Sequence, residues 1–89
     1  MTEEEFDELR PAAFAIAYRM LGSVSEAEDV VQEGFLRLHS AREGGEQIAS
    51  PRAYLSTVVS RLSLDHLRSA RVRRETYVGD WLPEPLVTS

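Results

Sequence analysis

The sequence predicts an all-α protein: a compact three-helix domain with an extended C-terminal tail. Apolar residues recur at helical spacing in three separate stretches, and helix-start signals precede each stretch. No stretch shows the strict alternation of polar and apolar residues that marks a β-strand. A length of 89 residues suits one domain. We place this domain at residues 1–75 and the start of an interdomain linker at residues 76–89.

The first helix is expected to begin after Thr2. Thr2 and Glu5 have the Ser/Thr-x-x-Glu spacing that satisfies two unpaired amides at a helix start. The apolar stripe that follows consists of Phe6, Leu9, Ala13, Ile16, Ala17 and Met20. Pro11 lies inside this run and removes one backbone hydrogen bond, so we expect the helix either to kink there or to start there. Gly22 predicts its end.

The second helix is expected to begin at Ser25, which repeats the capping spacing with Glu28, and to end near Arg42. Its apolar stripe consists of Ala27, Val30, Val31, Gly34, Phe35 and Leu38. The next eight residues have no periodicity and contain two adjacent glycines, which predicts a loop: Glu43, Gly44, Gly45, Glu46, Gln47, Ile48, Ala49 and Ser50.

The third helix is expected to run from Pro51, with Ser50 as its N-cap, to about Arg74. Its apolar stripe consists of Leu55, Val58, Val59, Leu62 and His66. Beyond Glu75 the composition changes, and Pro83 and Pro85 prevent a continuous helix, so we expect a tail.

The net charge of −5 is unevenly distributed along the chain. Residues 1–48 contain 11 acidic residues and 4 arginines, whereas residues 49–89 contain 4 acidic residues and 6 arginines. All ten basic residues are arginines. Arginine suits bidentate contacts with phosphate or carboxylate, but we attribute the absence of lysine mainly to codon bias of the source genome.

The side of each helix opposite its apolar stripe carries the information about partners. In the second helix this side bears Asp29, Gln32, Glu33 and Leu36. It is either a solvated surface with one exposed leucine or a docking surface for a basic helix.

In the third helix the corresponding side bears Thr57, Arg61, Leu64, Arg68 and Arg71, and Arg73 and Arg74 extend the positive charge. Asp65 has the spacing for intrahelical ion pairs with Arg61 and Arg68. One carboxylate cannot neutralise five arginines. This side is therefore either a solvated surface or a phosphate-binding ridge.

Several function classes find no support in the residues. The chain has no Cys, which excludes disulfides and thiolate metal sites and removes the commonest covalent nucleophile. His39 and His66 fit no zinc spacing. We therefore expect no enzyme, metal or cofactor. Because no apolar run is long enough to span a bilayer and the start is acidic, we expect a cytoplasmic protein without membrane contact.

Three stretches together resemble region 2 of bacterial extracytoplasmic-function (ECF) sigma factors. They read AYRMLGS at residues 17–23, EAEDVVQEGFLR at residues 26–37, and PRAYL through LDHLR at residues 51–68. Residues 77–85 further resemble the linker of the subgroup with an extra C-terminal domain of the ketosteroid-isomerase-like (SnoaL-like) type.

The resemblance implies a transcription initiation domain that binds core RNA polymerase, through the β′ clamp helices, and recognises and melts the promoter −10 element. It also implies a possible anti-sigma factor, or the chain's own further C-terminal domain, as a partner. The implied polymerase-binding residues are Asp29, Val30, Val31, Gln32, Glu33 and Leu36. The implied DNA-binding residues are Arg52, Arg61, Arg68, Arg71, Arg73 and Arg74. The loop of residues 43–50 would capture a flipped base of the non-template strand.

The main alternative is a three-helix interaction module that binds a partner protein without touching DNA. Weak binding of single-stranded DNA that is lost when Arg61 and Arg68 are replaced would favour the sigma factor interpretation. An enzyme is the least supported interpretation, and a stoichiometric metal would revive it.

Overall fold

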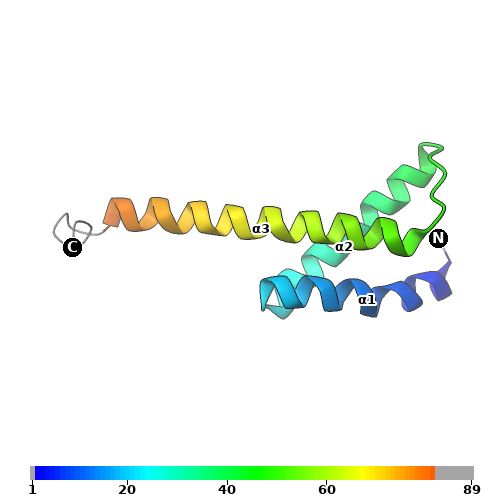
Figure 1. The fold of residues 1–89 in the computed structure, drawn as a ribbon, viewed down its shortest axis with the longest axis horizontal. Helices are drawn as coiled ribbons and strands as arrows, with labels where there is room; N and C mark the ends of the chain where they lie inside the picture. Colours follow the sequence, from blue (N-terminus) through cyan, green and yellow to red (C-terminus); the bar gives the residue numbers. More distant parts are fainter. Residues whose placement is uncertain (1, 82–89) are drawn as a thin grey trace.

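A computed structural model describes residues 2–81, with side chains described as far as Arg73. It contains three helices, α1 (Glu3–Leu21), α2 (Val24–Glu43) and α3 (Pro51–Trp81), and no strand within residues 2–81. Helices α1 and α3 run in the same direction, α2 crosses them, and each helix packs against the other two (Figure 1). The prediction of an all-α three-helix domain is confirmed.

Helix α1 is capped as its sequence predicts. The Thr2 hydroxyl accepts a hydrogen bond from the Glu5 amide at 3.1 Å. Gly22 adopts the left-handed conformation (φ 69°) and donates its amide to the Tyr18 carbonyl, which ends the helix. A start at Pro11 is wrong, because the helix already begins at Glu3. The N-cap and the packing of the first two turns offset the one hydrogen bond lost at the proline.

The N-cap of helix α2 lies two residues earlier than predicted. Its N-cap is Ser23, not Ser25, and the Ser23 hydroxyl accepts from the Glu26 amide at 3.4 Å. Both serines have a glutamate three residues later, and the earlier pair leaves only two residues between α1 and α2. The predicted apolar stripe is confirmed, because all six of its residues are buried.

The core combines residues of all three helices: Leu9, Ala13, Ala17, Ala27, Val30, Val31, Phe35, Leu38, Leu55 and Val59. Gly34 allows α2 to approach α3 closely, since a Cβ there would lie 3.0 Å from Val59 Cγ2 and 3.2 Å from Leu55 Cδ1. Ser63 is also buried, and its hydroxyl has no hydrogen-bond partner in the described part of the chain. The apolar pattern of the sequence did not indicate this residue. On the predicted stripe of α3, Val58, Leu62 and His66 are only half-buried.

Helix α3 extends seven residues beyond its predicted end at Arg74 and reaches Trp81. Residues 75–81 contain no proline, so nothing in the backbone interrupts the helix before Pro83. The predicted linker of residues 76–89 therefore begins within a helix, and its residues 82–89 lie outside the described part of the chain.

Candidate functional site

The outward side of α2 bears the residues predicted to bind a partner. Asp29, Gln32, Glu33 and Leu36 are all exposed, and Leu36 retains 55% of its accessible surface. Val30 and Val31 are only 4% and 3% exposed and pack in the core. The two valines can support this surface from beneath, but in the folded domain they offer almost no area to a partner. We call Asp29, Gln32, Glu33 and Leu36 the α2 face.

An apolar groove borders the α2 face on the side of α1. Its volume is about 640 Å³, and the residues that line it include Phe6 and Phe35, whose ring centroids lie 4.5 Å apart. Gln32 and Leu36 line the groove as well as the α2 face. The sequence did not predict the groove, because it forms only where two helices meet. Phe6 belongs to the predicted apolar stripe of the first helix, but it is 37% exposed because it lines this groove.

The two carboxylates of the α2 face differ in their surroundings. Glu33 Oε2 accepts from Arg37 Nε at 3.2 Å, and both side chains are about half exposed. Asp29 forms no hydrogen bond or ion pair through its side chain with any described residue. A basic partner therefore meets an unopposed charge at Asp29 and must compete with Arg37 at Glu33.

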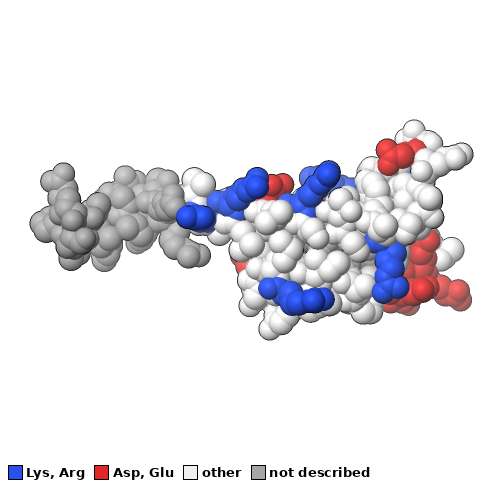
Figure 2. All heavy atoms as spheres, viewed as in Figure 1, with Lys and Arg blue, Asp and Glu red and all other residues white. Residues whose placement is uncertain are grey.

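The predicted basic side of α3 is exposed in the structure. Arg61, Arg68 and Arg71 lie on one side of the helix and define what we call the α3 ridge. Asp65 forms no ion pair among the described residues, so it neutralises neither Arg61 nor Arg68. Basic residues line α3 in Figure 2, whereas acidic residues gather around the start of α1. The domain thus separates its charges.

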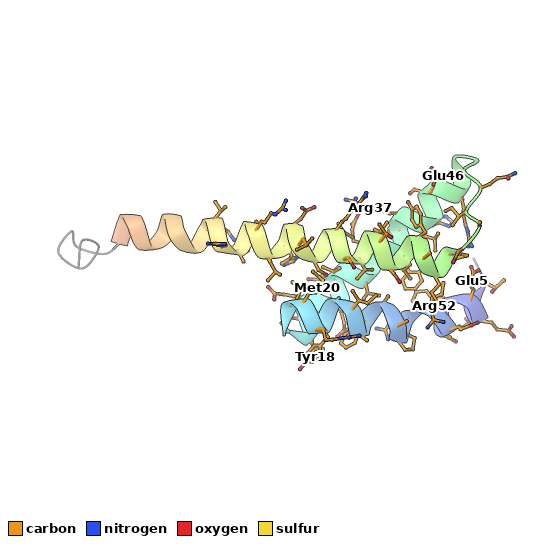
Figure 3. All side chains as sticks on the ribbon, viewed as in Figure 1. Glu5, Tyr18, Met20, Arg37, Glu46 and Arg52 are labelled. Carbon is orange, nitrogen blue, oxygen red and sulfur yellow. The ribbon has the colours of Figure 1, made fainter. Side chains whose placement is uncertain are left out.

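The other predicted DNA-binding arginines do not extend this ridge uniformly. Arg52 precedes Arg61 by nine residues, which at about 100° per residue places it on the opposite side of the helix. It lies on the side of α3 that faces α1 (Figure 3). Arg73 lies on the same side of α3 as Leu55, which faces the core nearer the start of the helix, but Arg73 itself is exposed. The side chain of Arg74 lies outside the described part of the structure.

A second groove lies between α2 and α3 and continues the α3 ridge. Its volume is about 500 Å³, and it is lined by Arg37, Ala53, Tyr54, Thr57, Val58 and Arg61. The groove brings two guanidinium groups and one aromatic ring to the same surface. The sequence did not indicate Arg37 or Tyr54, because their proximity depends on the packing of α2 on α3.

The loop of residues 43–50 is anchored at both ends. Glu43, the first residue of the predicted loop, is the last residue of α2 in the structure, so the loop begins at Gly44. Gly45 adopts a positive φ of 89°, which a residue with a Cβ rarely adopts. At the other end the Ser50 hydroxyl accepts from the Ala53 amide at 3.2 Å, as predicted for the N-cap of α3. Ile48 is half-buried against the core. Glu46, at the tip of the loop in Figure 3, is exposed.

The histidines pair with carboxylates rather than with each other. His39 Nε2 lies 3.1 Å from Glu43 Oε1, and His66 Nε2 lies 3.6 Å from Glu26 Oε1. No group of three or more potential metal ligands occurs among residues 2–81. In the same range no helix is both long and apolar enough to cross a bilayer.

Comparison with known proteins identifies the family. The chain matches the Sigma-70 region 2 family over residues 6–73. It is 57% identical over 88 residues to the ECF RNA polymerase sigma factor SigJ of Mycobacterium tuberculosis. The aligned stretch covers 99% of this chain and 27% of SigJ. Identity to the ECF RNA polymerase sigma factor SigL of the same species is 41% over 69 residues, covering 76% of this chain and 39% of SigL.

A more distant relative is the ECF RNA polymerase sigma factor SigW of Bacillus subtilis, with 31% identity over 58 residues, 65% of this chain and 31% of SigW. The chain spans between about a quarter and two-fifths of the length of these relatives. No solved structure gives a significant match. Sigma factors are transcription initiation factors and not enzymes. The chain belongs to the Sigma-70 region 2 family and is an ECF-type sigma factor domain.

Proposed function

We propose that this domain docks on the β′ clamp helices of RNA polymerase through the α2 face, and holds the non-template strand of the −10 element with the α3 ridge and the loop of residues 43–50. The observation that best supports this division is that one small core carries exposed acidic residues on the outward side of α2 and exposed arginines on the outward side of α3. Polymerase in turn implies the cytoplasm as the place of action.

Docking on polymerase would combine charge with apolar contact. Asp29 offers an unopposed carboxylate, and Gln32 adds an amide that can donate and accept hydrogen bonds. Leu36 lies on the edge of the apolar groove. A partner helix with basic residues beside one apolar side chain would match this arrangement, with the apolar side chain entering the groove. Val30 and Val31 hold the face in place from the core.

Binding of DNA would depend mainly on the phosphate backbone. Arg61, Arg68 and Arg71 occupy nearly three turns of one side of α3, which suits successive phosphates along a strand. The adjoining groove adds Arg37 and the ring of Tyr54, and an aromatic ring can stack on an unpaired base. Arg52 lies on the other side of the helix, so it would contribute less.

The loop of residues 43–50 would bind a base that has left the stack. All of its residues except Ile48 are exposed, while Ile48 packs against the core and Ser50 caps α3. Extruding a base costs a few kcal/mol, and contacts with the loop must repay that cost. Exchange of this loop for that of a relative should change the preferred base at one −10 position without changing the affinity for polymerase.

The docking proposal is tested by measuring the affinity of core polymerase for the protein and for Asp29→Arg. We expect an affinity loss of about tenfold or more, because like charges facing each other at an interface cost several kcal/mol. Glu8→Arg is the matched control, since Glu8 is exposed on α1 and outside the groove beside the α2 face. Unchanged affinity of Asp29→Arg, with normal helicity and melting temperature, would refute the docking assignment.

A partner-binding module without DNA contact remains the alternative function, and the exposed apolar groove is the observation that favours it. The complex of the protein with core polymerase should bind single-stranded −10 DNA, and this binding should fall when Arg61 and Arg68 are replaced. Binding of a partner protein without any DNA binding would support the alternative.

We also propose, from the resemblance of residues 77–85, that the chain comes from the subgroup with a ketosteroid-isomerase-like C-terminal domain. An anti-sigma factor or this further domain could then act as a partner. The reading frame after Ser89 tests the proposal directly. A frame that encodes a second helical DNA-binding region and no such domain would contradict it.

A further inference from the structure

The first turn of α1 and the last turn of α2 are joined by a bidentate ion pair between Glu5 and Arg42. Arg42 Nη1 donates to Glu5 Oε1 at 2.8 Å, and Arg42 Nη2 donates to Glu5 Oε2 at 3.3 Å. Two parallel hydrogen bonds fix the orientation of both groups as well as their distance. The hydrogen bond from Arg42 also lowers the pKa of the Glu5 carboxyl below its ordinary value. Neither residue belongs to the α2 face or the α3 ridge, and neither lines the groove beside each of these surfaces.

Glu5 is itself held firmly on α1. Its backbone amide donates to the Thr2 hydroxyl at 3.1 Å, which caps the helix. The next residue, Phe6, packs against Phe35 of α2 with ring centroids 4.5 Å apart. The backbone at Glu5 is therefore fixed relative to α2, and the bidentate pair ties the Arg42 side chain to this backbone.

Arg42 in turn borders the loop proposed to capture a base. The amide of Gly45 donates to the Arg42 carbonyl at 3.1 Å, and the amide of Glu46 donates to the Ala41 carbonyl at 3.0 Å. The exposed tip of the loop is thus hydrogen-bonded to the helical turn that Glu5 holds. Any change in the direction of this turn moves the tip directly, because only two residues separate Arg42 from Gly45.

We propose that Glu5 and Arg42 are positioning residues that set the direction of the base-capture loop. The proposal rests on the proposed role of that loop. Neither side chain contacts the base, and the guanidinium of Arg42 is engaged by a carboxylate rather than held ready for a phosphate. Loosening the pair leaves the loop present but imprecisely placed, so discrimination between bases falls more than overall binding.

The experiment uses the protein assembled with core polymerase and single-stranded oligonucleotides in which each −10 position is randomised. Two variants break the pair, Glu5→Gln and Arg42→Lys. Glu4→Gln is the matched control, because Glu4 has the same charge, lies on the same turn and forms no ion pair among the described residues. Affinity for polymerase and melting temperature are measured for every variant, together with a loop exchange at residues 44–47.

Discrimination at a contacted position is typically about 5- to 150-fold. We expect both pair variants to reduce it several-fold at one and the same −10 position, with unchanged affinity for polymerase and no effect of Glu4→Gln. A lower melting temperature with unchanged base preference would show that the pair is purely structural and overturn the proposal. An equal gain in affinity for every oligonucleotide in the Glu5→Gln variant would also overturn the proposal. Arg42 would then be a phosphate contact that the loss of Glu5 releases.

The loop exchange separates failure of this inference from failure of the proposed function. If the exchange alters base preference and Glu5→Gln does not, the loop captures the base and only the positioning role is wrong. If neither change alters base preference, the loop is not the base-reading element, and both proposals are refuted.

Discussion

The outward sides of α2 and α3 differ in the ion pairs that their carboxylates form within the described part of the domain. On α2, Glu33 is paired with Arg37 and Glu28 lies 3.7 Å from Arg10, and an apolar groove lies alongside. On α3, Asp65 neutralises neither of the neighbouring arginines among the described residues. The α2 face is therefore suited to a partner that brings apolar as well as charged groups. The α3 ridge is suited to a polyanion, whose binding depends strongly on salt.

The largest expected effect comes from removing the core that both surfaces share. Leu38 is completely buried on α2, and Leu38→Ala should lower the free energy of unfolding by about 2–5 kcal/mol. A loss of this size is a large fraction of the stability of a small domain, so both surfaces should fail together. Thermal unfolding followed by circular dichroism measures the loss. Leu36→Ala is the matched control on the same helix, and its melting temperature should stay close to that of the unchanged protein because Leu36 is exposed.

A smaller effect distinguishes the two carboxylates of the α2 face. Asp29→Asn should weaken binding of core polymerase more than Glu33→Gln does, because Glu33 already shares its charge with Arg37. The measurement is a titration of core polymerase with each variant at one salt concentration. Equal losses would mean that the partner displaces Arg37 without cost. A larger loss for Glu33→Gln would place the centre of the docking surface nearer to α3.

The α3 ridge should show its function in the salt dependence of binding. Arg61→Ala should weaken single-stranded DNA binding similarly for all −10 sequences and reduce the slope of log affinity against log salt by roughly one unit. Arg52→Ala removes the same charge from the other side of the helix and should change the slope less. A loss confined to certain sequences would instead identify Arg61 as a base reader, in the groove that it shares with Tyr54.

Features formed within one helix were predictable from the sequence. All six residues of the α2 stripe are buried, because one periodic pattern determines which side of a helix faces the core. The same geometry identified Asp29, Gln32 and Leu36 as outward residues. The end of α3 was placed too early because a change in composition is a weaker signal than the first proline.

Features formed between helices were not predictable in the same way. The Glu5–Arg42 pair joins residues 37 positions apart, and both grooves require the crossing of two helices. Burial of Ser63 likewise depends on the packing of α3 against its neighbours, since a serine gives no apolar signal. Arg37 was within reach of a sequence argument, because its spacing of four residues from Glu33 favours an ion pair.

The smallest expected effect concerns the start of α2, where the sequence offers two equivalent caps. Ser23→Ala removes the hydroxyl that accepts a hydrogen bond from the Glu26 amide and should lower the free energy of unfolding by about 0.5–2 kcal/mol. Ser25→Ala removes a hydroxyl that lies 3.4 Å from the Ser23 hydroxyl and is bonded to no helix amide among the described residues. It should therefore change stability by no more than a few tenths of a kcal/mol. Urea denaturation of the two variants compares them directly. A larger loss for Ser25→Ala would place the start of α2 two residues later. In that case the turn between α1 and α2 would be longer, and Asp29 would lie two residues closer to the start of its helix.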